Sequence, residues 1–245
     1  MRGYDDASYG EGFADVYDDW YAGITDTDAT VATLSALANG GRVLELGVGT
    51  GRLAIPLAST GLDVYGVDSS TAMLRQLAAK PNSAAVHVSL ADMAEELPAG
   101  PFSLIFVAYN TIFNLTTEQR QRSCFAQVAQ RLSDGGTFVV EAFVPDPSLH
   151  DPPSQVAVRS MAVDRVVLSV TQARVDAQLA EGHFIEITEA GGVRLRPWSI
   201  RWVTLEQLDN MAAAAGLALA ERWEAFDRSP FSATSTRHVS VYRKN

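Results

Sequence analysis

A short apolar segment followed by glycines at alternate positions limits most strongly what this chain can fold into. The segment VLELGVGTGRL (residues 43–53) carries an acid, Glu45, and then Gly47, Gly49 and Gly51. Glycines in such a loop let bare backbone approach a ligand and permit dihedral angles that a Cβ would forbid. The pattern predicts a strand, a loop that holds a nucleotide-like ligand, and a helix whose N-terminus can attract an anion.

Short apolar strands alternate with helices on both sides of this loop. A helix is expected over Thr27–Ala38, and others over residues 51–59, 70–79 and 117–132, the last with a capping box of Thr116 and Gln119. The strands expected between them are RVLELG, LDVYGVD, AAVHVS, FSLIFVA and TFVVEAF. This alternation predicts an α/β fold with a doubly wound, parallel sheet, whose ligands bind at the carboxyl ends of the strands.

The rhythm changes after the Pro-rich connection VPDPSLHDPP (residues 144–153). Residues 156–175, 178–188 and 193–203 alternate with period two, which predicts three segments of an antiparallel meander. A helix over 204–216 and two strands, LALAERWEAF and TSTRHVSVYR, follow. We expect an N-terminal helical segment over residues 1–40, an α/β core from 41–150 and 204–245, and the meander of 151–203 inserted as a cap.

Composition excludes several classes of function. The chain of 245 residues has a net charge of −10, which argues against tight binding to nucleic acid. No apolar run is long enough to span a bilayer, and the acidic N-terminus lacks a signal peptide, so a cytoplasmic protein is expected. The single cysteine, Cys124, lies in an apolar helical stripe and is expected to pack in the core.

Two acids follow the next two strands. Asp68 ends the second strand, where a carboxylate can accept from both ribose hydroxyls of an adenosine, as in proteins that bind NAD or S-adenosylmethionine (SAM). Asp92 follows the third strand and is placed to accept from an adenine amino group, with the Met93 backbone at the ring edge and Met73 over a ring face. Two other interpretations stay open: Asp92 as the cap of the next turn, and Met73 as a packing residue.

Glu45, the glycines, Asp68 and Asp92, in this order and at strand ends, resemble the class I SAM-dependent methyltransferases. The resemblance rests on their [V/L]LE[L/V]GxGTG motif and covers roughly residues 41–145. It implies a Rossmann-like, mostly parallel seven-stranded sheet, SAM as the cofactor with S-adenosylhomocysteine as product, and in-line methyl transfer to N or O of a small metabolite or natural-product scaffold. The cofactor residues that it implies are Tyr17, Tyr21, Glu45, Gly47, Gly49, Gly51, Asp68, Ser69, Met73, Asp92, Met93, Ala108 and Tyr109.

The sequence indicates fewer residues for binding the methyl acceptor than for binding the cofactor. Glu141, near the end of the fifth strand, and His183, in the meander, are the candidate general bases; the alternatives are a strand-end acid bonded to backbone and an exposed histidine. Tyr17 and Tyr21 are candidates for the cofactor carboxylate, or members of a helical packing stripe. No metal is expected. The partners expected are a small-molecule acceptor and a second copy of the chain in a homodimer, with neither nucleic acid nor membrane.

The meander occupies the place where amino-sugar N-methyltransferases carry a β-stranded cap. Its segment RLRPWSIRW puts four side chains on one face, which either contact an acceptor or form a solvated outer face: Arg194, Arg196, Trp198 and Trp202. Asn110 lies in AYNTIFN, which lacks the prolines of the N-P-P-Y motif, so DNA and protein amide methyltransferases are disfavoured.

A second class of function is a nucleotide-binding protein without transferase activity. It would be either an NAD-linked oxidoreductase or a catalytically silent SAM-binding module. The G-x-G-x-G spacing departs from the G-x-G-x-x-G dinucleotide fingerprint, and together with Asp92 it disfavours NAD.

Overall fold

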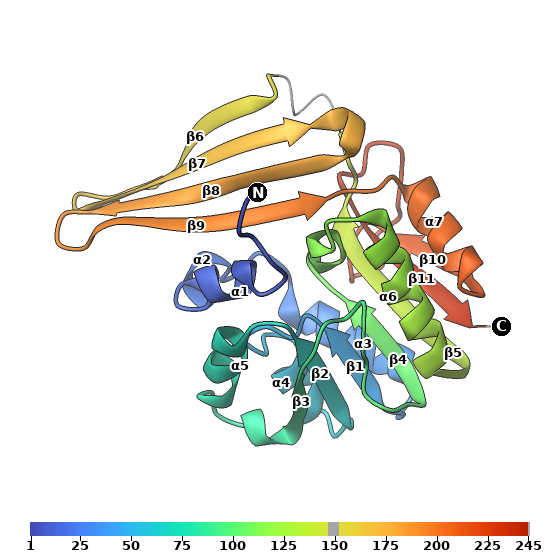
Figure 1. Cartoon of the computed structure of the whole chain (residues 1–245). Helices are drawn as coiled ribbons and strands as arrows, with labels where there is room; N and C mark the ends of the chain where they lie inside the picture. The colour runs from blue at the N-terminus through green and yellow to red at the C-terminus, as the bar shows by residue number, and fades with distance from the viewer. Residues whose placement is uncertain (147–151, 245) are drawn as a thin grey trace.

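The computed structural model describes residues 1–146 and 152–244 and shows two sheets (Figure 1). In these residues seven strands form the core sheet. Their spatial order is β10 (Leu217–Trp223), β11 (Arg237–Lys244), β5 (Leu132–Phe143), β4 (Phe102–Val107), β1 (Val43–Leu46), β2 (Val64–Asp68) and β3 (Val86–Leu90). β11 pairs antiparallel with β10 and β5, and the other pairs are parallel. The predicted doubly wound, mostly parallel seven-stranded sheet is confirmed.

Helices on both faces bury this sheet. They are α3 (Thr27–Ala38), α4 (Ala54–Ser59), α5 (Thr71–Ala78), α6 (Glu118–Arg131) and α7 (Leu205–Ala214). Successive residues of a strand enter opposite layers: Phe138 packs with Phe125 of α6, whereas its neighbour Val139 belongs to the buried cluster on the other face, which includes Leu57 of α4. All three apolar residues of β1 are fully buried, as expected for a strand covered on both faces.

Helix ends differ in detail from the sequence prediction. The predicted capping box of Thr116 and Gln119 is wrong, because Thr117 is the N-cap of α6 and its side chain accepts from Arg120 N. Helix α4 begins at Ala54 rather than at Gly51, since the residues before it belong to the glycine loop. Cys124 is fully buried in α6, as predicted.

Four described strands form the cap sheet, in the order β6 (Ser154–Met161), β7 (Arg165–Arg174), β8 (Leu179–Thr188) and β9 (Gly192–Arg201). The prediction of one segment over residues 156–175 is wrong: β6 and β7 are separate strands, and Ala162 N donates to Arg165 O across a tight turn. The two-residue alternation of apolar and polar residues continues through this turn, so the sequence pattern alone did not reveal that the strand ends there. Part of the predicted Pro-rich connection, residues 147–151, and with it the expected core–cap boundary, lies outside the described residues.

The N-terminal segment lies between the cap sheet and the core (Figure 1). Its helices are α1 (Ser8–Phe13) and α2 (Tyr17–Trp20). Phe13 is fully buried and packs with Met73 of the core and with Phe184 and Trp198 of the cap. This one side chain therefore joins all three parts of the molecule.

Polar contacts reinforce the same junction. Arg196 of β9 is almost fully buried, and its guanidinium contacts Asp15 and Glu186, each at 2.6 Å. The four cap residues singled out from the sequence do not form one solvated outer face, because Arg196 and Trp202 are buried.

Candidate functional site

The glycine loop after β1 gives each glycine a different task. All three have positive φ: 70° at Gly47, 54° at Gly49 and 80° at Gly51. A Cβ on Gly47 would lie 2.4 Å from Thr111 Cγ2, and one on Gly51 would lie 2.9 Å from Leu77 Cγ. A Cβ on Gly49 would meet nothing nearer than 4.0 Å, so open space lies in front of this residue. Gly51 thus serves packing, whereas Gly49 presents bare backbone to a cavity.

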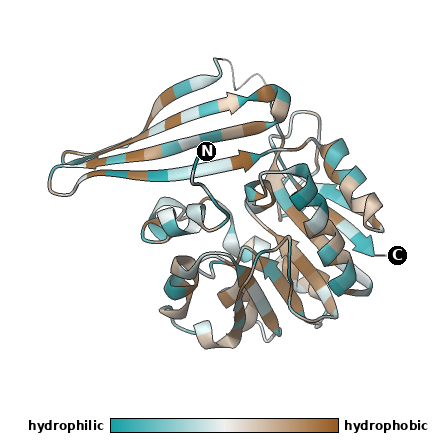
Figure 2. Cartoon of the chain, viewed as in Figure 1, coloured by the Kyte–Doolittle hydropathy of each residue, from teal (hydrophilic) through white to brown (hydrophobic). Residues whose placement is uncertain are grey.

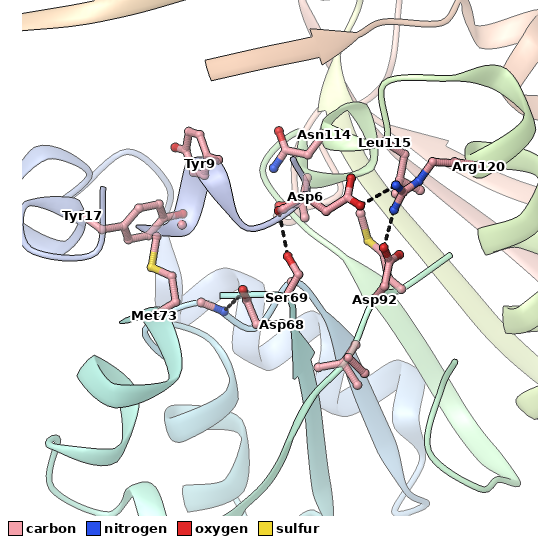
Figure 3. A pocket seen from close by; sticks show the side chains of 17 residues that line it. Asp6, Tyr9, Tyr17, Asp68, Ser69, Met73, Asp92, Asn114, Leu115 and Arg120 are labelled. Atoms are coloured by element: carbon pink, nitrogen blue, oxygen red, sulfur yellow. Dashed lines mark hydrogen bonds and ion pairs between the residues drawn. The ribbon is translucent and has the colours of Figure 1, made fainter. Parts of the chain in front are cut away.

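That cavity lies at the carboxyl ends of β1, β2 and β3, beneath the N-terminal segment (Figure 3). It encloses about 660 Å³ of space, part of which is open to solvent. Predicted residues that line it are Tyr17, Gly47, Gly49, Asp68, Ser69, Met73, Asp92 and Met93. Lining residues that the sequence analysis did not single out include Asp6, Tyr9, Gly10, Asn114, Leu115 and Arg120.

Asp68 stands at the end of β2 and faces the glycine loop. Its Oδ2 accepts from Gly49 N and its Oδ1 accepts from Ser70 N, both at 2.8 Å. Burial raises the pKa of this carboxyl above its ordinary value. Each oxygen keeps a second lone pair, so the carboxylate can still accept from a pair of ribose hydroxyls.

Asp92 caps a turn and also lines the cavity, so its role toward an adenine stays a prediction. Its Oδ1 accepts from Ala94 N at 2.7 Å, so it does cap the turn after β3. It also lines the cavity, where its Oδ2 pairs with Arg120 of α6, and the same guanidinium pairs with Asp6 of the N-terminal segment (Figure 3). Ser69 Oγ donates to Asp6 O at 2.8 Å, so this end of the cavity is closed by polar contacts.

Met73 is a packing residue that also borders the cavity, and its contact with an adenine stays a prediction. It is 3% exposed and packs with Phe13 and Ala14, yet it also lines the cavity.

Glu45 lies beneath the loop and carries an unsatisfied acceptor. Its side chain is 5% exposed, and its Oε2 has no hydrogen-bond partner among the described residues. Burial raises the pKa of this carboxyl to about 8. A buried, orphaned carboxylate oxygen favours a cationic donor nearby, and the amino group of SAM is such a donor. Together with the open face of Gly49 and the free lone pairs of Asp68, this atom shows that the residues present fit SAM.

A second pocket of about 470 Å³ adjoins the first and shares Tyr17 with it. Tyr21 and Arg52 also line it, and Arg52 Nη1 donates to Thr25 Oγ1 at 2.6 Å. The guanidinium lowers the pKa of both Tyr17 and Glu45 against the larger, raising effect of burial. The sequence analysis passed over Arg52, although its place directly after Gly51 in the motif was an available signal.

The turn after β4 is strained and firmly held. Tyr109 and Asn110 have φ of 48° and 66°, a left-handed conformation that costs roughly 1–2 kcal/mol for a residue with a Cβ. Glu141 Oε2 accepts from Tyr109 N at 2.9 Å, and Asn110 Oδ1 accepts from Phe143 N at 2.7 Å. The Tyr109 ring lies 5.7 Å from that of Tyr21. Strain of this kind concentrates at functional sites.

The two candidate bases lie in different places. Glu141 is 9% exposed, burial raises its pKa, and its carboxylate is bonded to backbone at the Tyr109 turn. His183 lies on β8 opposite Val170 and Pro197 and does not line either described pocket. Its Nδ1 is buried without a partner in the described part of the chain. The structure therefore does not bring these two residues together.

Two further searches covered the described residues only. They contain no helix long and apolar enough to cross a membrane. They also contain no group of three His, Cys, Asp or Glu side chains placed to hold a metal ion.

Comparison with known proteins agrees with this site. The methyltransferase domain family matches residues 43–136. The crystal structure of the CcbJ methyltransferase from Streptomyces caelestis is 40% identical in sequence and has a TM-score of 0.89, over 98% of this chain and 99% of that one. SAM-bound CalS10, an amino pentose methyltransferase from Micromonospora echinaspora, shares the fold at 21% identity and a TM-score of 0.63, over 100% and 93% of the two chains.

A curated relative, an uncharacterized methyltransferase of Geobacillus thermodenitrificans, is 33% identical over 129 residues. That alignment covers 53% of this chain and spans only 57% of the relative's length. The CcbJ likeness extends over nearly the whole of both chains, and the family match falls on the glycine loop and the acids that line the cavity. The chain therefore belongs to the class I SAM-dependent methyltransferases, and its cofactor is S-adenosylmethionine.

Proposed function

We propose that this protein transfers the methyl group of SAM to a nitrogen or oxygen atom of a small metabolite or natural-product scaffold. The observation that carries the proposal is the cavity in which the bare backbone of Gly49 lies beside Asp68. Glu45 of β1 does not line this cavity, but it keeps a buried oxygen without a partner among the described residues. These groups offer an adenosine and an ammonium the partners that each requires.

The cofactor roles follow from where the residues lie. Asp68 would accept from the ribose hydroxyls, and Asp92 and the Met93 backbone would face the adenine. Glu45 would receive the amino group, and Arg52 with Tyr17 and Tyr21 would hold the carboxylate in the adjoining pocket. Gly47, Ser69 and Met73 shape the walls, and Gly51 acts through packing.

Methyl transfer needs alignment more than it needs proton chemistry. When bound, SAM supplies an electrophilic methyl group whose bond to sulfur breaks as its bond to the acceptor atom forms, and an acceptor proton is lost to solvent or to a base. Ala108 and the strained Tyr109 turn, fixed by Glu141, would line the side on which the acceptor is aligned. Glu141 or His183 as general base stays a prediction, and the hydrogen bond to Tyr109 N favours a positioning role for Glu141.

The cap supports a small acceptor. Arg159 of β6 reaches the N-terminal segment, with its guanidinium carbon 4.6 Å from the Phe184 ring centroid and 4.9 Å from that of Trp20. It forms no ion pair with the described acids, and its charge lowers the pKa of Tyr109 against the raising effect of burial. An aromatic and cationic wall opposite Tyr109 suits a compact polar acceptor, and CalS10, with the same fold, is an amino pentose methyltransferase. A homodimer is part of the proposal.

The test is product formation with a panel of small amines, amino sugars and phenols. We expect S-adenosylhomocysteine and a singly methylated acceptor, both detected by mass spectrometry and both lost in Asp68→Ala. SAM binding without product from any acceptor would favour the catalytically silent module. Binding of NADH in place of SAM would favour the oxidoreductase.

A further inference from the structure

The face of the cap sheet turned away from the core carries an unusual set of side chains. Residues that alternate along a strand share a face, and strand register aligns them into rows. Three rows cross the sheet from β6 to β9 on this face: Val156, Val170, His183 and Pro197; Val158, Leu168, Ile185 and Leu195; Met161, Val166, Ile187 and Val193. We call these twelve side chains the outer cap face. None of them is charged.

Exposure separates the two faces of the cap sheet. On the outer cap face Val156 is 71% exposed, Val158 61% and Leu195 56%. On the opposite face Val167 is fully buried, and Arg196 is 1% exposed because its guanidinium contacts Gly12 and Asp15 of the N-terminal segment. Figure 2 shows the resulting bands of hydrophobic and hydrophilic residues along the cap strands. The described residues therefore leave the part of the outer cap face away from the core exposed, whereas His183, nearer the core, is partly covered.

Its area is large for a single exposed apolar patch. Full burial of an aliphatic side chain removes roughly 60–120 Å² from water, so twelve partly exposed ones present on the order of 500 Å². Contiguous apolar patches on monomers rarely exceed a few hundred Å². A standard interface buries about 800 Å² per partner, which this patch and its margins approach.

Charge and shape favour a second copy of this chain as the occupant. With a net charge of −10, two copies repel each other over most of their surfaces, and they approach at least cost through a face without charge. A four-stranded apolar sheet face is complementary to itself, since two such sheets pack face to face at about 10 Å with interdigitated side chains. In a dimer with two-fold symmetry the same patch is buried on both copies, so no unpaired patch is left to recruit a third copy.

We propose that the protein forms a two-fold dimer in which the outer cap faces of two copies pack against each other. No residue of the outer cap face lines the cofactor cavity, so the interface does not use the cavity's lining. The dimer does not depend on the identity of the acceptor.

The test is the molar mass of the full chain in solution, by sedimentation velocity and light scattering over a range of concentrations. The wild type should have twice the monomer mass of 26.4 kDa. A double variant, Val158→Lys and Leu195→Lys, places two cations in the middle row and should sediment as a monomer. Leu90→Lys is the matched control, because Leu90 is 60% exposed on β3 of the core sheet, and it should remain dimeric.

Circular dichroism and SAM titration accompany each variant. Unchanged folding and SAM affinity in the double variant show that its loss of mass reflects the interface alone. A wild type of monomer mass throughout, or a double variant that stays dimeric, would overturn the proposal. Capture of a different protein by a monomeric wild type would likewise reject self-association, and none of these results bears on methyl transfer.

Discussion

The carboxylate of Asp68 accepts a hydrogen bond from the backbone amide of Gly49 at 2.8 Å, which ties the end of β2 to the middle of the glycine loop. The two residues are nineteen positions apart in the chain. The bond holds the loop open at the point where a ligand must touch backbone, and it needs both a left-handed residue and an acid at the strand end. The glycine loop and Asp68 therefore form one structural unit at the ligand site.

Gly49→Ala tests the open face of the loop. The new methyl group would project into the cavity, so SAM affinity should fall about tenfold or more, a change of ~1.4 kcal/mol. Gly61→Ala is the control, because Gly61 also has positive φ, 90°, and open space around it, but does not line the cavity. Both variants should lose similar stability, roughly 1–2 kcal/mol from backbone strain. Equal SAM affinity in the two variants by calorimetry would show that Gly49 does not face the cofactor.

Glu45 should release a proton when SAM binds. With a pKa of about 8 it is mostly protonated at pH 7 in the free protein, and a neighbouring ammonium favours its ionised form. Binding heats measured at pH 7 in buffers of different ionisation enthalpy should therefore depend on the buffer. The dependence should largely vanish in Glu45→Gln. Wild-type heats that do not vary with buffer would contradict this role.

The same carboxyl should make the stability of the free protein depend on pH. Its folded-state pKa of about 8 lies above its ordinary value of 4.5, so its contribution is fully present below pH 4.5 and is lost as pH rises to 8. The free energy of unfolding should fall over this window by an amount on the order of a few kcal/mol, relative to Glu45→Gln. Urea unfolding at several pH values measures the difference, and parallel pH profiles in the two proteins would refute it.

The ion pairs of Arg120 should slow the departure of the product. Asp6→Asn removes the charge that ties the N-terminal segment to Arg120, so S-adenosylhomocysteine should dissociate roughly two- to fivefold faster, the effect of a partly exposed pair worth ~0.5–1 kcal/mol. Asp19→Asn is the control in the same segment, because Asp19 is exposed and makes no ion pair with any described residue. Stopped-flow displacement measures both rates. An unchanged dissociation rate in Asp6→Asn would show that the Asp6–Arg120 ion pair does not retain the product.

Much of the core could be predicted because its signals are local. The strand VLELG and the glycines after it are set by backbone sterics within a few residues, and Asp68 and Asp92 follow because parallel strands end at one edge. The helix expected over Thr27–Ala38 has these ends in the structure, where Asp26 caps it and Asn39 ends it in a left-handed conformation.

What escaped prediction depends on contacts between distant parts of the chain. Arg120 and Asp6 are 114 positions apart, and nothing in either neighbourhood indicates that they meet over Asp92. For Arg196 the sequence left open an acceptor contact or a solvated face, whereas in the structure it is buried between Glu186 of the cap and Asp15 of the N-terminal segment. The acceptor pocket, the general base and a cytoplasmic location stay predictions, since no local pattern fixes them.

Calorimetric titration of SAM into Asp68→Ala tests the central claim most directly. The wild type should bind one SAM per chain, and Asp68→Ala should bind it at least about tenfold more weakly, the loss of a charge-assisted hydrogen bond worth ~1.5–3 kcal/mol. Asp63→Ala, a change at the exposed end of the same strand, where Asp63 pairs with Arg42, should leave the affinity unchanged. Equal SAM affinity in all three proteins, or no SAM binding by the wild type, would contradict the assignment of this cavity to the cofactor.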